Sequence, residues 1–100
     1  MKIIDLAKYG PILGSKTIGD EIFHIITKEL GQDKKITVDL SEIKSMATFC
    51  AKQIFGQLYL QLGSKDFFDR IIIKGADNDL KTIIQIGIQH AIEDNKKTSS

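Results

Sequence analysis

The sequence is poor in three features that would point to a compartment or a partner: cysteines, excess charge and long apolar runs. A single cysteine, Cys50, excludes an internal disulfide and suits the reducing cytoplasm, the expected location. The 14 Lys and Arg against 13 Asp and Glu leave a net charge of +1, with no electrostatic footprint for nucleic acid or an anionic membrane. No apolar run approaches the roughly 20 residues that cross a bilayer. Because Asp5 interrupts the apolar start where a secretory signal would continue, we also expect no export.

The remaining composition is that of an ordinary globular protein. The 100 residues are 42% hydrophobic and 27% charged, which argues against disorder and suits one core. The chain shows no internal repeat, linker or low-complexity segment. We expect one domain over residues 1–95, followed by a polar tail over 96–100 that frays.

Three short segments are typical of β-strands. Residues 1–6 are apolar and partly β-branched, and residues 35–40 alternate between apolar and polar side chains. The third segment, 70–74, contains an unbroken run of three isoleucines. Such a run predicts a strand that is buried on both faces of a helix-covered sheet.

Amphipathic helices follow each of these strands. Apolar residues recur at spacings of three and four over 18–30, 49–62 and 80–92. The resulting β-α-β-α-β-α order predicts an α/β fold, a mostly parallel sheet covered by helices with right-handed crossovers. The expected helix caps and stops are Ser15, Gly31, Gly63 and either Asp77 or Asp79.

The segment 10–17 imitates a phosphate-binding loop. It follows a strand, opens a helix and departs from the pattern Gly-x-x-x-x-Gly-Lys-Ser/Thr only where Ser15 replaces a glycine. The Ser15 β-carbon obstructs the close approach of backbone amides to phosphates, so a turn and a capped helix form the main interpretation. The alternative is a small nucleotide- or anion-binding protein that uses this helix start. Its candidate residues are Gly14, Ser15, Lys16 and Thr17.

The other short motifs do not predict catalysis or a metal site. Ser41 and Lys44 have the spacing of some acyl-transfer enzymes but lack the partner motifs. His24 and His90 lie on different helices with no nearby ligand spacing. Cys50 stands at a helix start, where a dipole activates thiols, but no histidine base accompanies it and burial is the commoner role. We therefore expect no enzyme activity, no cofactor and no metal.

The connector 44–49 is the best candidate for a binding segment. It leaves the carboxyl end of the predicted middle strand and enters a helix, at the edge where sites lie in open α/β sheets. Ser45 and Thr48 are candidate phosphorylation sites, since a phosphate there adds about −1.5 to −2 charges beside the positive end of a helix dipole. The alternative role for Thr48 is a helix N-cap.

The stretches 36–43 (ITVDLSEI) and 45–56 (SMATFCAKQIFG) resemble STAS-like domains, the relatives of bacterial anti-sigma factor antagonists. The similarity is greatest to a small STAS-like family of unknown function. The resemblance implies that the loop and helix after a middle strand dock a histidine-kinase-like ATPase, which phosphorylates a serine in an Asp-Ser-Ser-Gly pattern. In this sequence Phe49 stands at the modified serine and Ala47 replaces the aspartate, so the phosphorylation switch is not carried over.

These observations predict a non-catalytic regulatory module that binds another protein. The expected contact residues are Ser45, Met46, Ala47, Thr48, Phe49 and Lys52. Phe49 is equally compatible with a place in the core, because large apolar side chains are most often buried. A homodimer or a structural building block is the third hypothesis.

Overall fold

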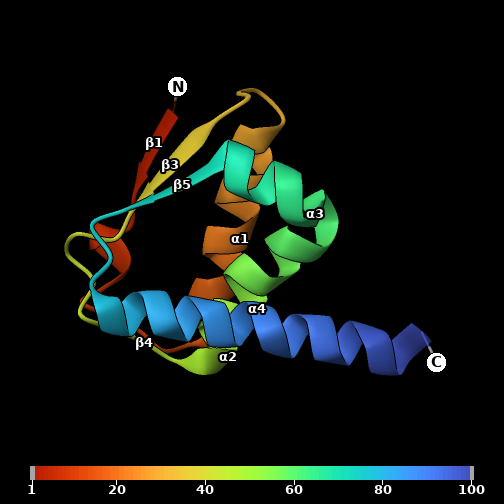
Figure 1. Cartoon of the computed structure of the whole chain (residues 1–100). Coiled ribbons are helices and arrows are strands. Elements are labelled where there is room, and N and C mark those ends of the chain that lie inside the picture. Colours follow the sequence, from red (N-terminus) through yellow and green to blue (C-terminus); the bar gives the residue numbers. More distant parts are fainter. Residues whose placement is uncertain (1, 100) are drawn as a thin grey trace.

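Three parallel strands form the central sheet of the computed structural model, which describes residues 2–99 and their side chains through residue 96. These strands are β1 (Lys2–Asp5), β3 (Ile36–Asp39) and β5 (Ile71–Lys74), in the spatial order β1-β3-β5 (Figure 1). Both outer strands pair in parallel with β3. The predicted strands and their parallel arrangement are confirmed.

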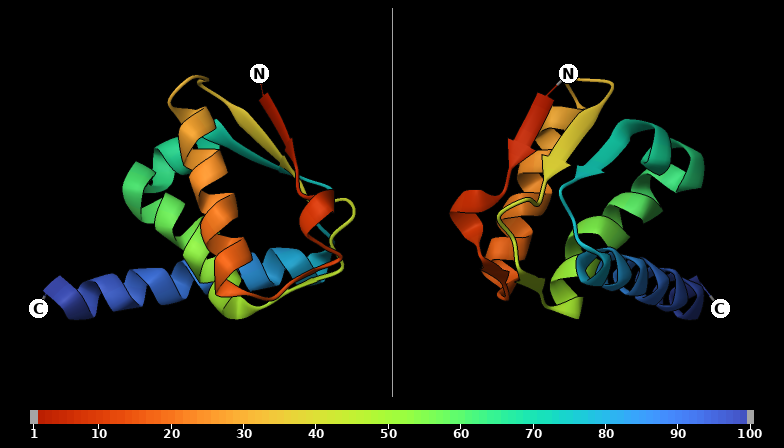
Figure 2. Two further views of the ribbon diagram at one scale, coloured as in Figure 1. Left: turned by 180° about the vertical axis from the view of Figure 1, so that it is seen from behind. Right: turned by 60° about the vertical axis from the view of Figure 1, so that its left-hand side comes forward.

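The long helices lie on one face of this sheet or beyond the carboxyl ends of its strands. Figure 2 shows α1 (Lys16–Leu30) and α3 (Gln57–Arg70) on the same side of the sheet. The helix α4 (Asn78–Ser99) follows β5 and packs against residues 48–56. A short helical turn, η1 (Ala7–Tyr9), follows β1. The β-α-β-α-β-α order is confirmed, and the helices cover one face of the sheet.

The opposite face of the sheet corrects the prediction for the isoleucine run. Ile71 is buried and Ile73 is half-buried, but Ile72 is 38% exposed. Ile3, which is in register with Thr37 and Ile72 on the same face, is 56% exposed. Because β5 is an edge strand and helices cover a single face, every second side chain of the run points toward solvent. The expectation of burial on both faces was therefore wrong.

A second, two-stranded sheet was not anticipated from the sequence. It pairs β2 (Ile12–Leu13) with β4 (Ser45–Met46) in parallel, with Ile12 opposite Ser45 and Leu13 opposite Met46. The Ala47 amide continues the pairing by donating to the Leu13 carbonyl at 2.8 Å. The ladder brings the start of α1 beside the start of the next helix.

That next helix changes its winding twice. It begins as α2 (Thr48–Ala51), continues as the π-helical turn η2 (Lys52–Gly56) and proceeds into α3. Gly63, with φ 83°, interrupts α3 in the left-handed region that favours glycine. The predicted stop at Gly63 is thus a break, after which a further helical segment extends to Arg70.

The crossing between this helix and α4 is close enough to require small residues. A β-carbon on Gly87 would lie 2.6 Å from backbone atoms of Ala51 and Lys52. A β-carbon on Gly56 would lie 2.7 Å from the Ala91 β-carbon and 2.9 Å from the Gly87 carbonyl oxygen. The two backbones therefore pack against each other directly.

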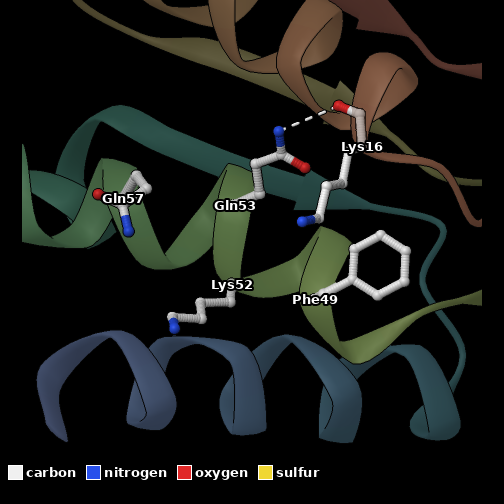
Figure 3. Close-up of a pocket in the computed structure, with 5 residues that line it drawn as sticks. All are labelled: Lys16, Phe49, Lys52, Gln53 and Gln57. Atoms are coloured by element: carbon white, nitrogen blue, oxygen red, sulfur yellow. Dashed lines mark hydrogen bonds between the residues drawn. The ribbon is translucent and has the colours of Figure 1, made fainter. Parts of the chain in front are cut away.

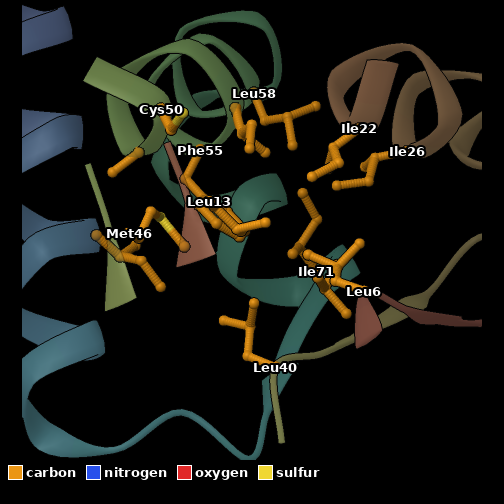
Figure 4. Close-up of a cluster of buried hydrophobic side chains, with 14 of the residues drawn as sticks. Leu6, Leu13, Ile22, Ile26, Leu40, Met46, Cys50, Phe55, Leu58 and Ile71 are labelled. Atoms are coloured by element: carbon orange, nitrogen blue, oxygen red, sulfur yellow. The ribbon is translucent and has the colours of Figure 1, made fainter. Parts of the chain in front are cut away.

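The core lies between the helices and the covered face of the sheet. Figure 4 shows side chains from both sheets and from the helical segments α1, α2, η2 and α3 converging there. Each fully buried leucine, isoleucine or phenylalanine contributes about 1.5–3 kcal/mol relative to exposure. The labelled members are Leu6, Leu13, Ile22, Ile26, Leu40, Met46, Cys50, Phe55, Leu58 and Ile71.

The last helix extends past the core. Its apolar pattern ends at Ile92, yet α4 continues to Ser99 with no glycine or proline to stop it. Residues 96–99, which the sequence assigns to a fraying tail, are therefore helical, and Ser100 lies outside the described residues. Within residues 2–99, none of the helices combines the length and hydropathy that a membrane crossing requires.

Candidate functional site

The β2–β4 ladder places two helix starts next to each other. Ser15 caps α1, because its Oγ accepts a hydrogen bond from the Ile18 amide at 3.1 Å. The N-cap of the second helix is Ala47, which has no side chain to accept such a bond, and Thr48 is the first helical residue. The predicted cap at Ser15 is confirmed, whereas the N-cap interpretation of Thr48 was wrong by one position.

Two side chains of the second helix bind the start of α1. Gln53 donates from Nε2 to the Lys16 carbonyl at 3.0 Å, and the Cys50 thiol donates to the Ser15 carbonyl at 3.3 Å. Gly19 makes this approach feasible, since a β-carbon there would lie 2.3 Å from Gln53 Oε1. The two helix starts therefore form one connected surface rather than two separate candidate sites.

A cavity of about 450 Å³ opens between these helix starts. Figure 3 shows the Lys16 ammonium pointing into the space between Gln53 and the Phe49 ring, with Gln57 one turn further along the helix. Lys52 lies on the side of the cavity that faces α4 (Figure 3). The cavity is lined by Lys16, Phe49, Lys52, Gln53 and Gln57.

The two lysines of this cavity differ in their electrostatic surroundings. Lys52 forms an ion pair with Asp94 of α4, and both side chains remain partly exposed. Lys16 has no carboxylate within ion-pair distance among the side chains described through residue 96. The cavity consequently carries one ammonium group whose charge no neighbouring carboxylate neutralises.

The predicted contact segment divides between the surface and the core. Phe49 is 44% exposed, so the question left open by the sequence is answered in favour of the surface. Ser45 and Thr48 are also exposed, and Ala47 is half-buried. Met46 is only 4% exposed, because the alternation along β4 turns Ser45 outward and Met46 into the core. Its assignment as a contact residue was wrong.

The candidate anion-binding segment contributes a single side chain to the cavity. Lys16 lines it, whereas the Ser15 hydroxyl is used to cap the helix. Gly14 and Thr17 are exposed but are not part of the cavity lining. The segment enters the helix directly from the β2–β4 ladder, so its four candidate residues do not line one common cavity.

In the part of the chain that the structure describes, Cys50 and His24 are not placed as an activated nucleophile or as metal ligands. Cys50 is fully buried, and desolvation raises the pKa of its thiol, the opposite of what an activated nucleophile requires. The exposed His24 ring has its polar contacts within its own helix, with Nδ1 2.8 Å from the Asp20 carbonyl oxygen and 3.7 Å from Asp20 Oδ1. Over residues 2–96, the His, Cys, Asp and Glu side chains do not gather into a group of three that would hold a metal ion.

Sequence reasoning missed two cavity residues, Gln53 and Gln57. The available signal was their spacing, because Phe49, Gln53 and Gln57 follow one another at intervals of four along a helix. Side chains at that interval share one helix face, and the wide π-helical turn keeps them aligned.

The parallel sheet, its helices on one face and the exposed helix start at the carboxyl edge together define a small mixed α/β fold. The chain belongs to the family described as the STAS-like domain of unknown function (DUF4325), whose model matches residues 19–81, more than half of the chain. This match confirms the resemblance found in the sequence. Searches of curated proteins and of solved structures gave no match.

Proposed function

We propose that this STAS-like chain is a non-catalytic regulatory module that binds another protein through the surface around Phe49. The observation that carries the proposal is the exposure of this phenylalanine at the rim of a cavity. An aromatic side chain in such a position offers a large apolar contact area at low entropic cost. In this proposal the docking surface consists of Ser45, Thr48, Phe49, Lys52 and Lys16.

The proposed partner is a histidine-kinase-like ATPase of the cytoplasm, as the resemblance to anti-sigma factor antagonists implies. Ser45 and Thr48 are both exposed, which supports a regulatory role for either hydroxyl. Phosphorylation of Thr48 would add negative charge beside Phe49 and four residues before Lys52 on the same helix, and would change which partner surface fits. The nucleotide-binding alternative is less favoured, because Lys16 alone of its four residues lines the cavity.

The test compares two exposed phenylalanines in partner binding. We expect Phe49→Ala to weaken binding to a partner recovered from the host by about tenfold or more, the loss typical of an aromatic anchor. Phe68→Ala is the matched control, since Phe68 is 67% exposed on α3 and lies outside the cavity. Affinities are measured by calorimetry with both purified proteins, and Thr48→Glu is expected to weaken binding as well.

Two results would contradict the proposal. If Phe49→Ala and Thr48→Glu, both folded by circular dichroism, bind the partner as tightly as the unaltered chain, this surface is not the docking site. If Phe68→Ala weakens binding as much as Phe49→Ala, the contact is not specific to the cavity.

A further inference from the structure

The cavity beside Phe49 combines chemical groups that suit an acidic ligand with an apolar neighbour. Lys16 and Lys52 supply ammonium groups, Gln53 and Gln57 supply amides, and Phe49 supplies an aromatic face. Lysine recognises a carboxylate as a compact point charge, and the aromatic ring accepts an aliphatic or aromatic side chain. Acidic side chains are not among the residues that line this cavity.

The chain itself carries an example of the ligand chemistry. The Asp94 carboxylate of α4 forms an ion pair with Lys52, one of the two cavity lysines. Because both side chains remain partly exposed, the pair is screened by solvent and another carboxylate can replace Asp94 at small cost. Lys16 has no such partner among the described side chains and retains its full attraction for an incoming acid.

We propose that this cavity receives an acidic side chain of the protein partner, with an adjacent apolar side chain of the partner packed on Phe49. In this arrangement Asp94 is an internal competitor, because it holds Lys52 until the carboxylate of the partner displaces it. The inference rests on the proposed function and specifies the chemistry of the partner segment. Charge complementarity sets the choice, since the cavity presents two cations and α4 neutralises only one of them.

The probe is a pair of short synthetic peptides that differ only in charge. In one peptide glutamate alternates with leucine, and in the other glutamine replaces every glutamate. Both are titrated at low salt into the full-length ¹⁵N-labelled chain, and amide chemical shifts are followed. We expect the glutamate peptide to shift resonances of residues 16, 49 and 52–57 and to bind several-fold more tightly than the glutamine peptide.

Three variants separate the contributions of the charges. Lys16→Met is expected to weaken binding of the glutamate peptide roughly two- to fivefold, which is the effect of one exposed charge pair, and to leave binding of the glutamine peptide unchanged. Asp94→Asn is expected to strengthen binding of the glutamate peptide by a similar factor, because Lys52 is released from its ion pair with Asp94. Lys65→Met, on an exposed lysine of α3 outside the cavity, is the control and should match the unaltered chain.

Several results would overturn the inference. Equal affinity for both peptides would show that the cavity does not require an acidic side chain. An unchanged affinity of the Asp94→Asn variant would show that Asp94 does not compete for Lys52. Inorganic phosphate is titrated in parallel, and shifts of residues 16 and 52 by phosphate without discrimination between the peptides would assign the cavity to small anions instead. If neither peptide binds while Phe49→Ala still weakens partner binding, the docking surface is supported and the acidic ligand is not.

Discussion

At the scale of single residues, Asp39 shows how the end of a strand is fixed by a short turn. Its Oδ1 accepts hydrogen bonds from the Ser41 hydroxyl at 2.5 Å and from the Ser41 amide at 2.9 Å. The Ser41 hydroxyl first, then the amide, and then the nearby charge of Lys74 lower the pKa of Asp39 below its ordinary value of 3.8. These bonds stabilise the charged carboxylate of Asp39 at the carboxyl edge of the sheet.

The lowered pKa predicts a dependence of stability on pH. Because the folded chain binds this proton less tightly than the unfolded chain, the contribution of Asp39 is present above pH 3.8 and is lost as the pH falls through the lower folded-state value. In urea unfolding between pH 6 and 2, Asp39→Asn should therefore show a shallower loss of the free energy of unfolding below about pH 4. Ser41→Ala should flatten the same region, and a profile as steep as that of the unaltered chain in both variants would contradict this account.

Single-residue predictions from the sequence succeeded where chemistry is local and failed where the helix start was displaced. Ser15 and one of Asp77 and Asp79 were expected to cap helices; Ser15 does, and of the two aspartates it is Asp77 whose Oδ1 accepts from the Leu80 amide at 2.8 Å. The N-cap prediction for Thr48 failed because Ala47, a residue with no capping side chain, occupies the N-cap position. The environment of Phe49 was undecidable, since the helix has apolar residues on more than one face and only the fold selects the buried one.

At the scale of elements, the two-residue strands β2 and β4 are the clearest case that the sequence does not reveal. Two residues are too few for an alternation pattern to register, and the pairing joins segments that are 33 positions apart. The long helices and the three-residue apolar run were identified because their patterns extend over several turns or a whole strand. The exposure of Ile72 depended on which face the helices cover, a property of the assembled layers.

The close crossing of α4 and the second helix predicts a strict size limit at Gly87. Gly87→Ala should lower the free energy of unfolding by about 1–3 kcal/mol, because its β-carbon meets backbone atoms that cannot turn away. The usual gain of alanine in a helix, about 0.5–1 kcal/mol, is too small to offset this clash. Urea unfolding measures the difference.

Gly14→Ala is the matched control for this substitution. Its β-carbon would meet only the Ile12 methyl group at 3.7 Å, an ordinary contact, so its stability should stay within about 0.5 kcal/mol of the unaltered chain. A Gly87→Ala variant as stable as Gly14→Ala would mean that the two helices are able to separate slightly.

At the scale of the whole molecule, the principal extents are 39 × 28 × 25 Å, and the end of α4 projects from the body of the molecule in Figures 1 and 2. The buried positions of this helix end at Ala91, and the ion pair of Asp94 with Lys52 lies beyond them. The core is therefore complete before the polar end of the helix begins.

A chain that ends at Ile92 should keep the fold. We expect its free energy of unfolding to fall by less than about 1 kcal/mol, because it loses a partly exposed ion pair and no buried apolar side chain. Urea unfolding and near-ultraviolet circular dichroism measure the change. A chain that ends before Ile84 is the contrasting variant and should unfold, whereas a loss above about 2 kcal/mol in the longer one would show that the polar end stabilises the body.

The ladder between β2 and β4 ties together two segments that lie far apart in the sequence. Backbone hydrogen bonds between β2 and β4 join the segment that follows β1 to the segment that follows β3, and the Gln53 and Cys50 side chains add two further bonds between the helix starts. Neither segment can therefore move away from the other unless these bonds break.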